Sequence, residues 1–113
     1  MKYIHSKTLR YYITENGKVP FLKWLKSHCD ATLQMRIRRR LDRLEMGNYG
    51  DYKSLGDGVF ELRLAFGAGY RIYFSEQDNK VIILLCGGDK SSQKIDIADA
   101  KRYWKDLQER SDE

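Results

Sequence analysis

Residues 58–74 read GVFELRLAFGAGYRIYF, and this stretch decides the fold. Two runs that alternate apolar and polar residues, 59–66 and 70–75, flank a glycine-rich turn, which is the pattern of a β-hairpin. Because side chains alternate across a strand, the apolar residues of both runs share one face. The other face then carries Arg63 and Arg71 as cross-strand or diagonal neighbours.

The two arginines of this hairpin need a compensating charge. Like charges so close destabilise a sheet, on the order of the 0.2–1 kcal/mol found for cross-strand pairs. In one interpretation, Glu61 pairs with Arg71 across the sheet and leaves a solvated ladder of ion pairs. In the other, the two guanidiniums hold phosphate oxygens through paired donors, and Tyr73 shares their face. The sequence leaves both interpretations open.

A short strand and two helices are predicted before the hairpin. Residues 8–14 are rich in β-branched and aromatic residues, as is typical of a strand. Pro20 suits the first turn of a helix over Pro20–His28. Asp30 can cap a second helix over residues 31–46, whose apolar residues recur at helical spacing.

One strand and one helix are predicted after the hairpin. Residues 81–86 are apolar at every position, as in a strand covered on both faces. Asp96 can cap a last helix. The buried stripe of that helix is expected to consist of Ile97, Ala100, Trp104 and Leu107.

The element order β-α-α-β-β-β-α predicts a single α+β domain over residues 1–113, built on a small antiparallel sheet. The connections between the last three strands are too short for parallel crossovers, so these strands should form a meander. We expect the first strand to pair with this sheet. We also expect the two N-terminal helices to pack on one of its faces.

Composition narrows the partners and the compartment. The chain has 113 residues, with 21 Lys and Arg against 16 Asp and Glu, and a net charge of +5. This balance favours an anionic partner, either nucleic acid or an acidic protein. The N-terminus lacks the apolar segment of a signal peptide, and no apolar run is long enough to span a bilayer. We therefore expect a soluble, cytoplasmic protein without a membrane partner.

The chemistry-bearing residues suggest RNA cleavage without a metal. His5, His28, Cys29 and Cys86 match no metal-ligand spacing, so we expect no metal and no cofactor. RNA supplies its own nucleophile, the 2′-OH, and arginines can stabilise the charge that develops on the phosphate. A lysine or tyrosine can move protons there if neighbouring cations lower its pKa.

The segment LLCGGDKSSQK, residues 84–94, follows the hairpin and can reach the arginine face. Its paired glycines either present backbone N–H groups as an anion-binding nest or form an ordinary turn. Lys90 and Lys94 lie just beyond the glycines and are candidate RNA contacts. The sequence therefore predicts that basic residues from two segments converge on one face.

The quoted hairpin and ILLCGGDKSSQKIDIADAKRYWKDL together resemble the RelE/ParE toxin superfamily of bacterial toxin–antitoxin modules. The likeness also takes in PFLKWLKS and the basic second helix, and it is strongest to the HigB-like, phage-derived branch of killer proteins. It implies a RelE-like fold. It also implies a ribosome-dependent endoribonuclease, an mRNA interferase that cuts messenger RNA in the decoding site through 2′-OH attack.

The resemblance assigns roles to individual residues. It puts Arg71 and Arg63 at the phosphate-binding face and Lys90 at the basic position after the last strand of the sheet. Lys53, on the loop before the hairpin, is a further RNA-binding candidate. Some members carry a C-terminal Tyr or His pair where this chain has isoleucines, so proton transfer is expected to fall to Tyr73 or Lys90.

The second helix carries a basic face, which either keeps the helix soluble or docks on ribosomal RNA through phosphate contacts. Its members are Arg36, Arg39, Arg40 and Arg43. The resemblance implies a cognate antitoxin, a small DNA-binding protein of helix-turn-helix type. Two other functions remain open: a ParE-like poison that binds DNA gyrase, and a non-catalytic module that binds only its antitoxin. ParE-like chains tend to lack the basic cleft, so Arg71 together with Lys90 favours the nuclease.

Overall fold

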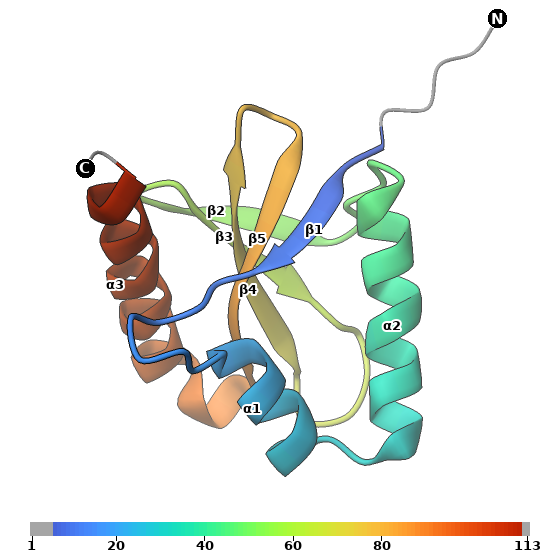
Figure 1. The fold of residues 1–113 in the computed structure, drawn as a ribbon. Helices are drawn as coiled ribbons and strands as arrows, with labels where there is room; N and C mark the ends of the chain where they lie inside the picture. The colour runs from blue at the N-terminus through green and yellow to red at the C-terminus, as the bar shows by residue number, and fades with distance from the viewer. Residues whose placement is uncertain (1–5, 112–113) are drawn as a thin grey trace, which may run out of the picture.

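The computed structural model describes residues 6–111, which form a five-stranded sheet with helices on both faces (Figure 1). Along the sheet the strands follow the order β1-β5-β4-β3-β2. Strand β1 runs parallel to β5, and every other neighbouring pair is antiparallel. The strands are β1 (Thr8–Tyr11), β2 (Tyr52–Gly56), β3 (Val59–Arg63), β4 (Arg71–Gln77) and β5 (Val81–Gly88). The predicted α+β class is confirmed, and the sheet is mixed because of β1.

The helices divide between the two faces of the sheet. Helices α1 (Pro20–His28) and α2 (Ala31–Glu45) pack on one face, as predicted, and α3 (Gln93–Ser111) covers the other. Figure 1 shows the sheet lying between α2 and α3. None of the helices within residues 6–111 is long and apolar enough to cross a membrane.

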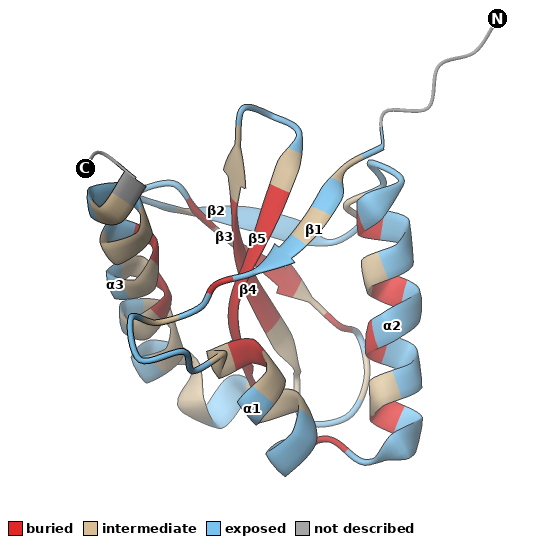
Figure 2. Cartoon of the chain, viewed as in Figure 1, coloured by how far each residue is buried: buried red, intermediate tan, exposed pale blue. Residues whose placement is uncertain are grey.

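Helix α2 forms for the reasons read from its sequence. Asp30 accepts a hydrogen bond from the backbone N–H of Leu33 at 2.8 Å, which satisfies one of the free donors of the first turn. Leu33, Ile37 and Leu44 are buried against the sheet, and Figure 2 shows buried positions recurring along the inner side of the helix. The stripe recurs at helical spacing, so a single face of α2 enters the core.

The central hairpin has the predicted faces. Strands β3 and β4 pair Phe60 with Phe74 and Leu62 with Ile72, and these four side chains join the core beneath α1 and α2. Strand β3 ends at Arg63, earlier than predicted, because the chain leaves the ladder to make a longer turn. Residue-by-residue alternation therefore holds where the strands pair.

Strand β2 was not predicted. It is an edge strand whose side chains are mostly exposed, so it lacks the apolar alternation that reveals a strand in sequence. Its pairing with β3 is made by a tight turn at Asp57 and Gly58, both of which have positive φ. Asp-Gly is the dipeptide that a type I′ hairpin turn favours, so a signal was present at the turn itself.

The paired glycines neither end the strand nor form a nest. Gly87 and Gly88 continue β5, opposite Ile72 and Arg71 of β4, and both are buried. A Cβ on Gly87 would lie 2.3 Å from the Trp24 ring, so the glycine permits α1 to approach the strand. The anion-nest interpretation is therefore wrong, because these backbone groups serve the sheet.

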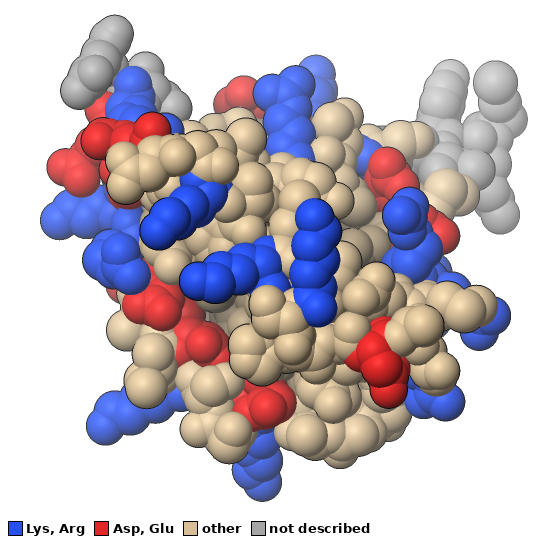
Figure 3. All heavy atoms as spheres, turned by 60° about the horizontal axis from the view of Figure 1, so that its bottom comes forward, with Lys and Arg blue, Asp and Glu red and all other residues tan. Residues whose placement is uncertain are grey.

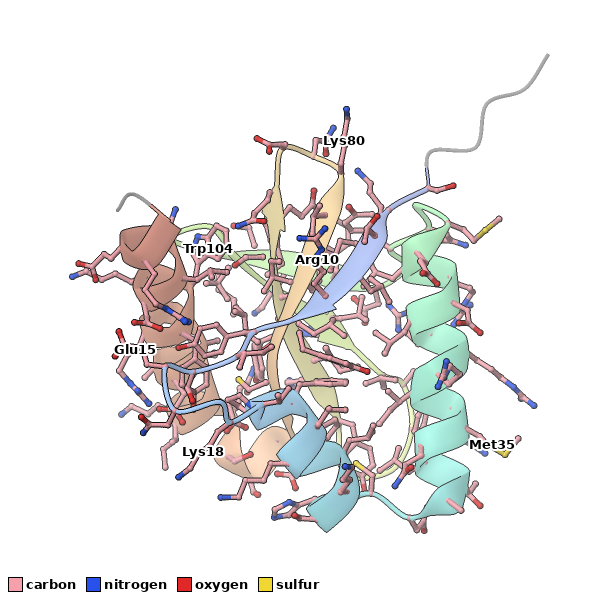
Figure 4. All side chains as sticks on the ribbon, viewed as in Figure 1. Arg10, Glu15, Lys18, Met35, Lys80 and Trp104 are labelled. Carbon is pink, nitrogen blue, oxygen red and sulfur yellow. The ribbon has the colours of Figure 1, made fainter. Side chains whose placement is uncertain are left out.

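The last helix begins earlier than predicted. A short 3-10 turn over Lys90–Ser92 precedes α3, and Asp89, not Asp96, caps it by accepting from the N–H groups of Ser91 and Ser92. Asp96 instead lies in the first turn of α3. The predicted stripe is confirmed: Ala100 and Trp104 are buried, and Ile97 and Leu107 pack beside them. Figure 4 shows Trp104 on the side of α3 that faces the sheet.

Candidate functional site

Arg63 and Arg71 lie directly opposite each other in the β3–β4 ladder. They are on the face that α3 covers, near the point where α3 begins, because β4 pairs its first residue with Gly88 at the end of β5. The Arg63 side chain is 39% exposed and that of Arg71 is 12% exposed. Of the two arrangements that the sequence left open, cross-strand and diagonal, the structure has the cross-strand one, at the edge of the covered face.

Glu61 supplies the compensating charge. Its carboxylate accepts a hydrogen bond from Arg63 Nε at 2.9 Å and lies 3.6 Å from Arg71 Nε. Gln93, the first residue of α3, donates to the other carboxylate oxygen at 2.8 Å. The predicted ion pair exists, but it is not a solvated ladder, since the Glu61 side chain is fully buried.

These contacts keep Glu61 charged. Burial alone raises the pKa of a carboxyl. Here the hydrogen bonds from Gln93 and Arg63, together with the positive charges of Arg71 and Arg63, outweigh burial and hold the pKa of Glu61 below its usual value. One carboxylate between two guanidiniums leaves the cluster with a net positive charge, which suits an anion.

Lys90 and Arg71 approach each other across the hairpin turn. The backbone N–H of Lys90 donates to the carbonyl of Ala68 at 3.2 Å, which ties the segment after β5 to the turn between β3 and β4. A Cβ on Gly69 would lie 3.2 Å from Arg71 Nη1 and 3.3 Å from Lys90 Cβ. Both residues therefore flank Gly69, and the structure brings together the three basic residues predicted for the site.

The two further RNA-binding candidates lie near this cluster. Lys53 of β2 pairs with Glu61 in the β2–β3 register, so it is on the face that carries the arginines, and its side chain is exposed. Lys94 is exposed in the first turn of α3, directly after Gln93. Lys53 can extend the positive surface from the pair Arg63 and Arg71 towards β2, and Lys94 can extend it towards α3.

Tyr73 is placed differently from the expectation. It shares the face of Arg71, but α3 covers it, and its side chain is fully buried. Its hydroxyl makes no hydrogen bond to the residues that the structure describes. Burial, followed by the charges of Glu61 and Asp96, raises the pKa of Tyr73. The residue therefore packs beneath the cluster and does not line an open surface.

Arg40 does not belong to the exposed basic face of α2. It is 7% exposed, and its guanidinium donates to the carbonyls of Arg63, Tyr49 and Asp51 at 2.6, 2.8 and 3.0 Å. Burial, and then the charge of Arg43, lowers its pKa. Arg40 is a structural residue, since it satisfies three carbonyls at the ends of two strands and a loop.

The three other predicted members of this basic face are exposed, as expected for either interpretation of the face. They are Arg36, Arg39 and Arg43. The Arg36 guanidinium lies 4.7 Å from the centre of the Phe66 ring, a cation–π contact with the turn after β3. On the face shown in Figure 3, Lys and Arg side chains are spread out, with Asp and Glu between them. That view shows separate positive groups and no continuous basic surface.

Gln93 is the residue that the sequence did not reveal. It reaches Glu61 because the turn capped by Asp89 sets the start of α3 above β3. The DKSS segment carries a capping signal, but the partner of Gln93 depends on the tertiary fold. For metals, residues 6–111 contain no group of three His, Cys, Asp or Glu side chains arranged as ligands, and both cysteines are free and buried.

Comparison with known proteins places the chain among its relatives. Residues 23–105 match the profile of a family described as phage derived protein Gp49-like (DUF891). The chain belongs to this family. The match includes α2, the β3–β4 hairpin, Lys90 and most of α3, so it spans every residue of the cluster described above. Gp49-like proteins are killer proteins of addiction modules, related to the RelE/ParE toxins.

A relative of this Gp49-like chain is found in Haemophilus influenzae. The two are 46% identical over 87 residues, which cover 77% of this chain and 88% of the relative. The relative is described as an uncharacterized protein, so it assigns no activity. The family indicates a toxin-like protein, whereas the reaction has to be argued from the residues of the site.

Proposed function

We propose that this protein is the toxin of a type II toxin–antitoxin module, of HigB-like kind, and that it cleaves messenger RNA on the ribosome. The observation that supports this most is the β3–β4 register, which sets Arg63 against Arg71 with Lys90 across the turn. Three cations on a partly exposed face form a site for a phosphodiester. Because the family consists of killer proteins, we infer that phosphodiester cleavage at this site is the toxic activity.

The proposed reaction uses the RNA as its own nucleophile. The 2′-OH loses its proton to solvent as its oxygen attacks the adjacent phosphorus, the bond to the 5′-oxygen breaks, and the products are a 2′,3′-cyclic phosphate and a 5′-OH. Arg63 and Arg71 donate to the non-bridging oxygens, where negative charge develops in the transition state. Removing a donor of this kind typically lowers kcat by ~10²–10³.

The proton that the departing 5′-oxygen needs is assigned to Lys90. Its side chain is exposed, and it flanks Gly69 together with Arg71. Tyr73, the other candidate, receives no contact with RNA in this proposal, because α3 covers its hydroxyl. General acid catalysis of this kind contributes typically ~10²–10⁴ to a rate.

The proposed partners are the ribosome, its messenger RNA and a cognate antitoxin of helix-turn-helix type. Phosphate contacts fix position without reading sequence, which suits the exposed basic residues around the cluster. These proposed ribosome and RNA contacts are Lys53, Lys94, Arg36, Arg39 and Arg43. The proposed place of action is the cytoplasm, where translating ribosomes are found.

The test is induction in growing bacteria, with the 5′ ends of messages mapped by primer extension. Wild type is compared with Arg71→Ala and with the control Lys80→Ala. The Lys80→Ala substitution also removes one positive charge, but it does so at the tip of the β4–β5 hairpin, where Figure 4 shows Lys80. We expect new ends within translated regions for wild type and Lys80→Ala, and none for Arg71→Ala.

The other outcomes identify the competing functions. Growth arrest without new message ends would support a gyrase-binding poison of the ParE type. No arrest with any variant would support a non-catalytic module whose partner is the antitoxin. New ends that persist with Arg71→Ala would remove Arg71 from the site.

A further inference from the structure

Glu61 is a fully buried carboxylate that accepts hydrogen bonds from Arg63 and Gln93 and forms an ion pair with Arg71. Arg63 comes from its own strand, Arg71 from the opposite strand and Gln93 from α3. A charge buried in this way is costly unless its partners satisfy it. An apolar residue at this position would pack against α3 more favourably. We therefore infer that the carboxylate has a role that an apolar side chain cannot fill.

The carboxylate meets both arginines by the same nitrogen. The contacts run to Arg63 Nε and Arg71 Nε, which lie on the inner side of each guanidinium. Within residues 6–111, the terminal nitrogens of Arg63 donate no hydrogen bond, and Arg71 uses Nη1 for the carbonyl of Gly69. Both terminal nitrogens of Arg63 and Nη2 of Arg71 thus have no partner among the described residues.

The carboxylate between the two guanidiniums counteracts their mutual repulsion. Arg63 and Arg71 face each other across a ladder where side chains are close, so without a carboxylate between them they repel and turn away. An arginine fork binds phosphate well only when its planar donors are held in place. Glu61 supplies the restraint, and Gln93 fixes the second carboxylate oxygen.

We propose that Glu61 is the positioning residue of the anion site: it holds Arg63 by a hydrogen bond from Nε–H and Arg71 by an ion pair on its Nε side, and directs their terminal nitrogens at the phosphate. This inference rests on the proposed function for its consequence in catalysis, although its structural part does not. The ion pair and the anion site are then one arrangement, with the carboxylate behind and the phosphate in front.

The proposal contradicts a purely Coulombic expectation. Glu61→Gln removes a negative charge from a cationic site, so charge alone predicts tighter RNA binding and an unchanged or faster reaction. Positioning predicts that kcat falls by about 10- to 100-fold, the range typical of residues that orient a reacting group. KM should stay the same or decrease, because the net charge of the site rises. A matched control is Asp57→Asn, which makes the same charge change at an exposed side chain.

The first readout does not need activity. Nitrogen-15 NMR of the arginine side chains reports the Nε–H groups, assigned with Arg63→Lys and Arg71→Lys. In wild type and Asp57→Asn, the Arg63 signal should be shifted from that of a free arginine by its hydrogen bond to Glu61, and both signals should exchange slowly with water. In Glu61→Gln the Arg63 signal should move to the position of a free arginine, and both signals should exchange faster. Titration with inorganic phosphate should shift them in wild type and less in Glu61→Gln.

The second readout is cleavage by purified protein on ribosomes programmed with a synthetic message. Loss of kcat without a rise in KM for Glu61→Gln supports the proposal, and wild-type kcat in a folded Glu61→Gln overturns it. If wild type does not cleave, the proposed function fails, and the NMR comparison still decides the positioning role. Nε–H signals that are the same in wild type and Glu61→Gln overturn that role.

A second variant covers the case in which Glu61→Gln does not fold. Gln93→Leu leaves both ion pairs and removes one donor to Glu61. We expect faster exchange of the Arg63 and Arg71 Nε–H protons and a smaller loss of kcat than for Glu61→Gln. Wild-type exchange rates together with wild-type kcat in Gln93→Leu would contradict the part of the proposal that concerns Gln93.

Discussion

Arg40 of α2 donates a hydrogen bond to the backbone carbonyl of Arg63 at 2.6 Å. A buried cation of the helix thus holds the end of the strand that carries one of the candidate phosphate ligands. The same guanidinium binds the carbonyls of Tyr49 and Asp51, so it also fixes the loop that leads into β2. One arginine of the basic helix is therefore structural, while its neighbours on α2 point to solvent.

Arg40→Met should lower the free energy of unfolding by about 2–3 kcal/mol, because three carbonyls lose a charged donor. The control Arg39→Met, at an exposed position of the same helix, should change it by less than about 0.5 kcal/mol. Urea denaturation followed by circular dichroism measures both. Equal effects of the two substitutions would contradict the structural role of Arg40.

Lys90→Ala should lower kcat on programmed ribosomes by about 10²-fold, the lower range for a lost general acid. Lys90 is exposed, so the thermal midpoint should not change. Lys94→Ala, a few residues along the same segment, should raise KM with little effect on kcat, because it removes a phosphate contact alone. Single-turnover cleavage separates these two effects, and a wild-type kcat for Lys90→Ala would leave proton transfer without its proposed donor.

Tyr73→Phe should leave cleavage close to wild type. The hydroxyl is buried and has no hydrogen-bond partner among residues 6–111, so its loss should leave stability unchanged or raise it by up to about 1 kcal/mol. The same cleavage assay and a urea titration measure the two quantities. A tenfold or larger fall in kcat with unchanged stability would return Tyr73 to the chemistry.

The charge of Glu61 should make stability depend on acid pH. Its pKa is lower in the folded protein than in the unfolded chain, so ionised Glu61 contributes stability above the unfolded value of about 4.3. That contribution is lost as the pH falls through the folded pKa. The stability difference between wild type and Glu61→Gln should therefore shrink below about pH 4.3. Urea titrations at pH 7 and pH 3 measure it, and a difference independent of pH would contradict the ionised, paired state.

Gly87→Ala should destabilise the protein by about 1–3 kcal/mol, the usual cost of an extra methyl group in a packed site. The new Cβ would meet the Trp24 ring, a rigid aromatic group packed on β5. Trp24→Leu should recover part of this loss in the double variant. Additive effects of the two substitutions would contradict the close approach of α1 to β5.

The features that the sequence predicted correctly depend on periodicity. The faces of the β3–β4 hairpin, the stripe of α3 and the Asp30 cap of α2 all follow from spacing along one segment. Such patterns predict the structure because apolar residues at a fixed period lie on one face of a helix or strand, and that face is buried. The same rule predicted that Arg63 and Arg71 share a face, while their direct opposition comes from the register.

The features that the sequence missed depend on contacts between distant segments. Strand β2 exists because β3 offers it an edge, although its own side chains are exposed. Arg40 is buried because carbonyls of β3 and of the loop before β2 converge on it, and Tyr73 is buried because α3 covers its face. For Arg40 and Tyr73 the residue type suggested an exposed side chain, and only the tertiary partner shows that it is buried.

The most direct test of the nuclease is cleavage of a message that carries one 2′-deoxynucleotide at the position mapped in cells. Purified wild-type protein is added to ribosomes programmed with this message or with its all-ribose counterpart. The account predicts that the ribose message is cut there to a 2′,3′-cyclic phosphate, and that the substituted message stays intact at that position. Equal cleavage of the two messages would contradict 2′-OH attack, and with it the metal-free reaction assigned to Arg63, Arg71 and Lys90.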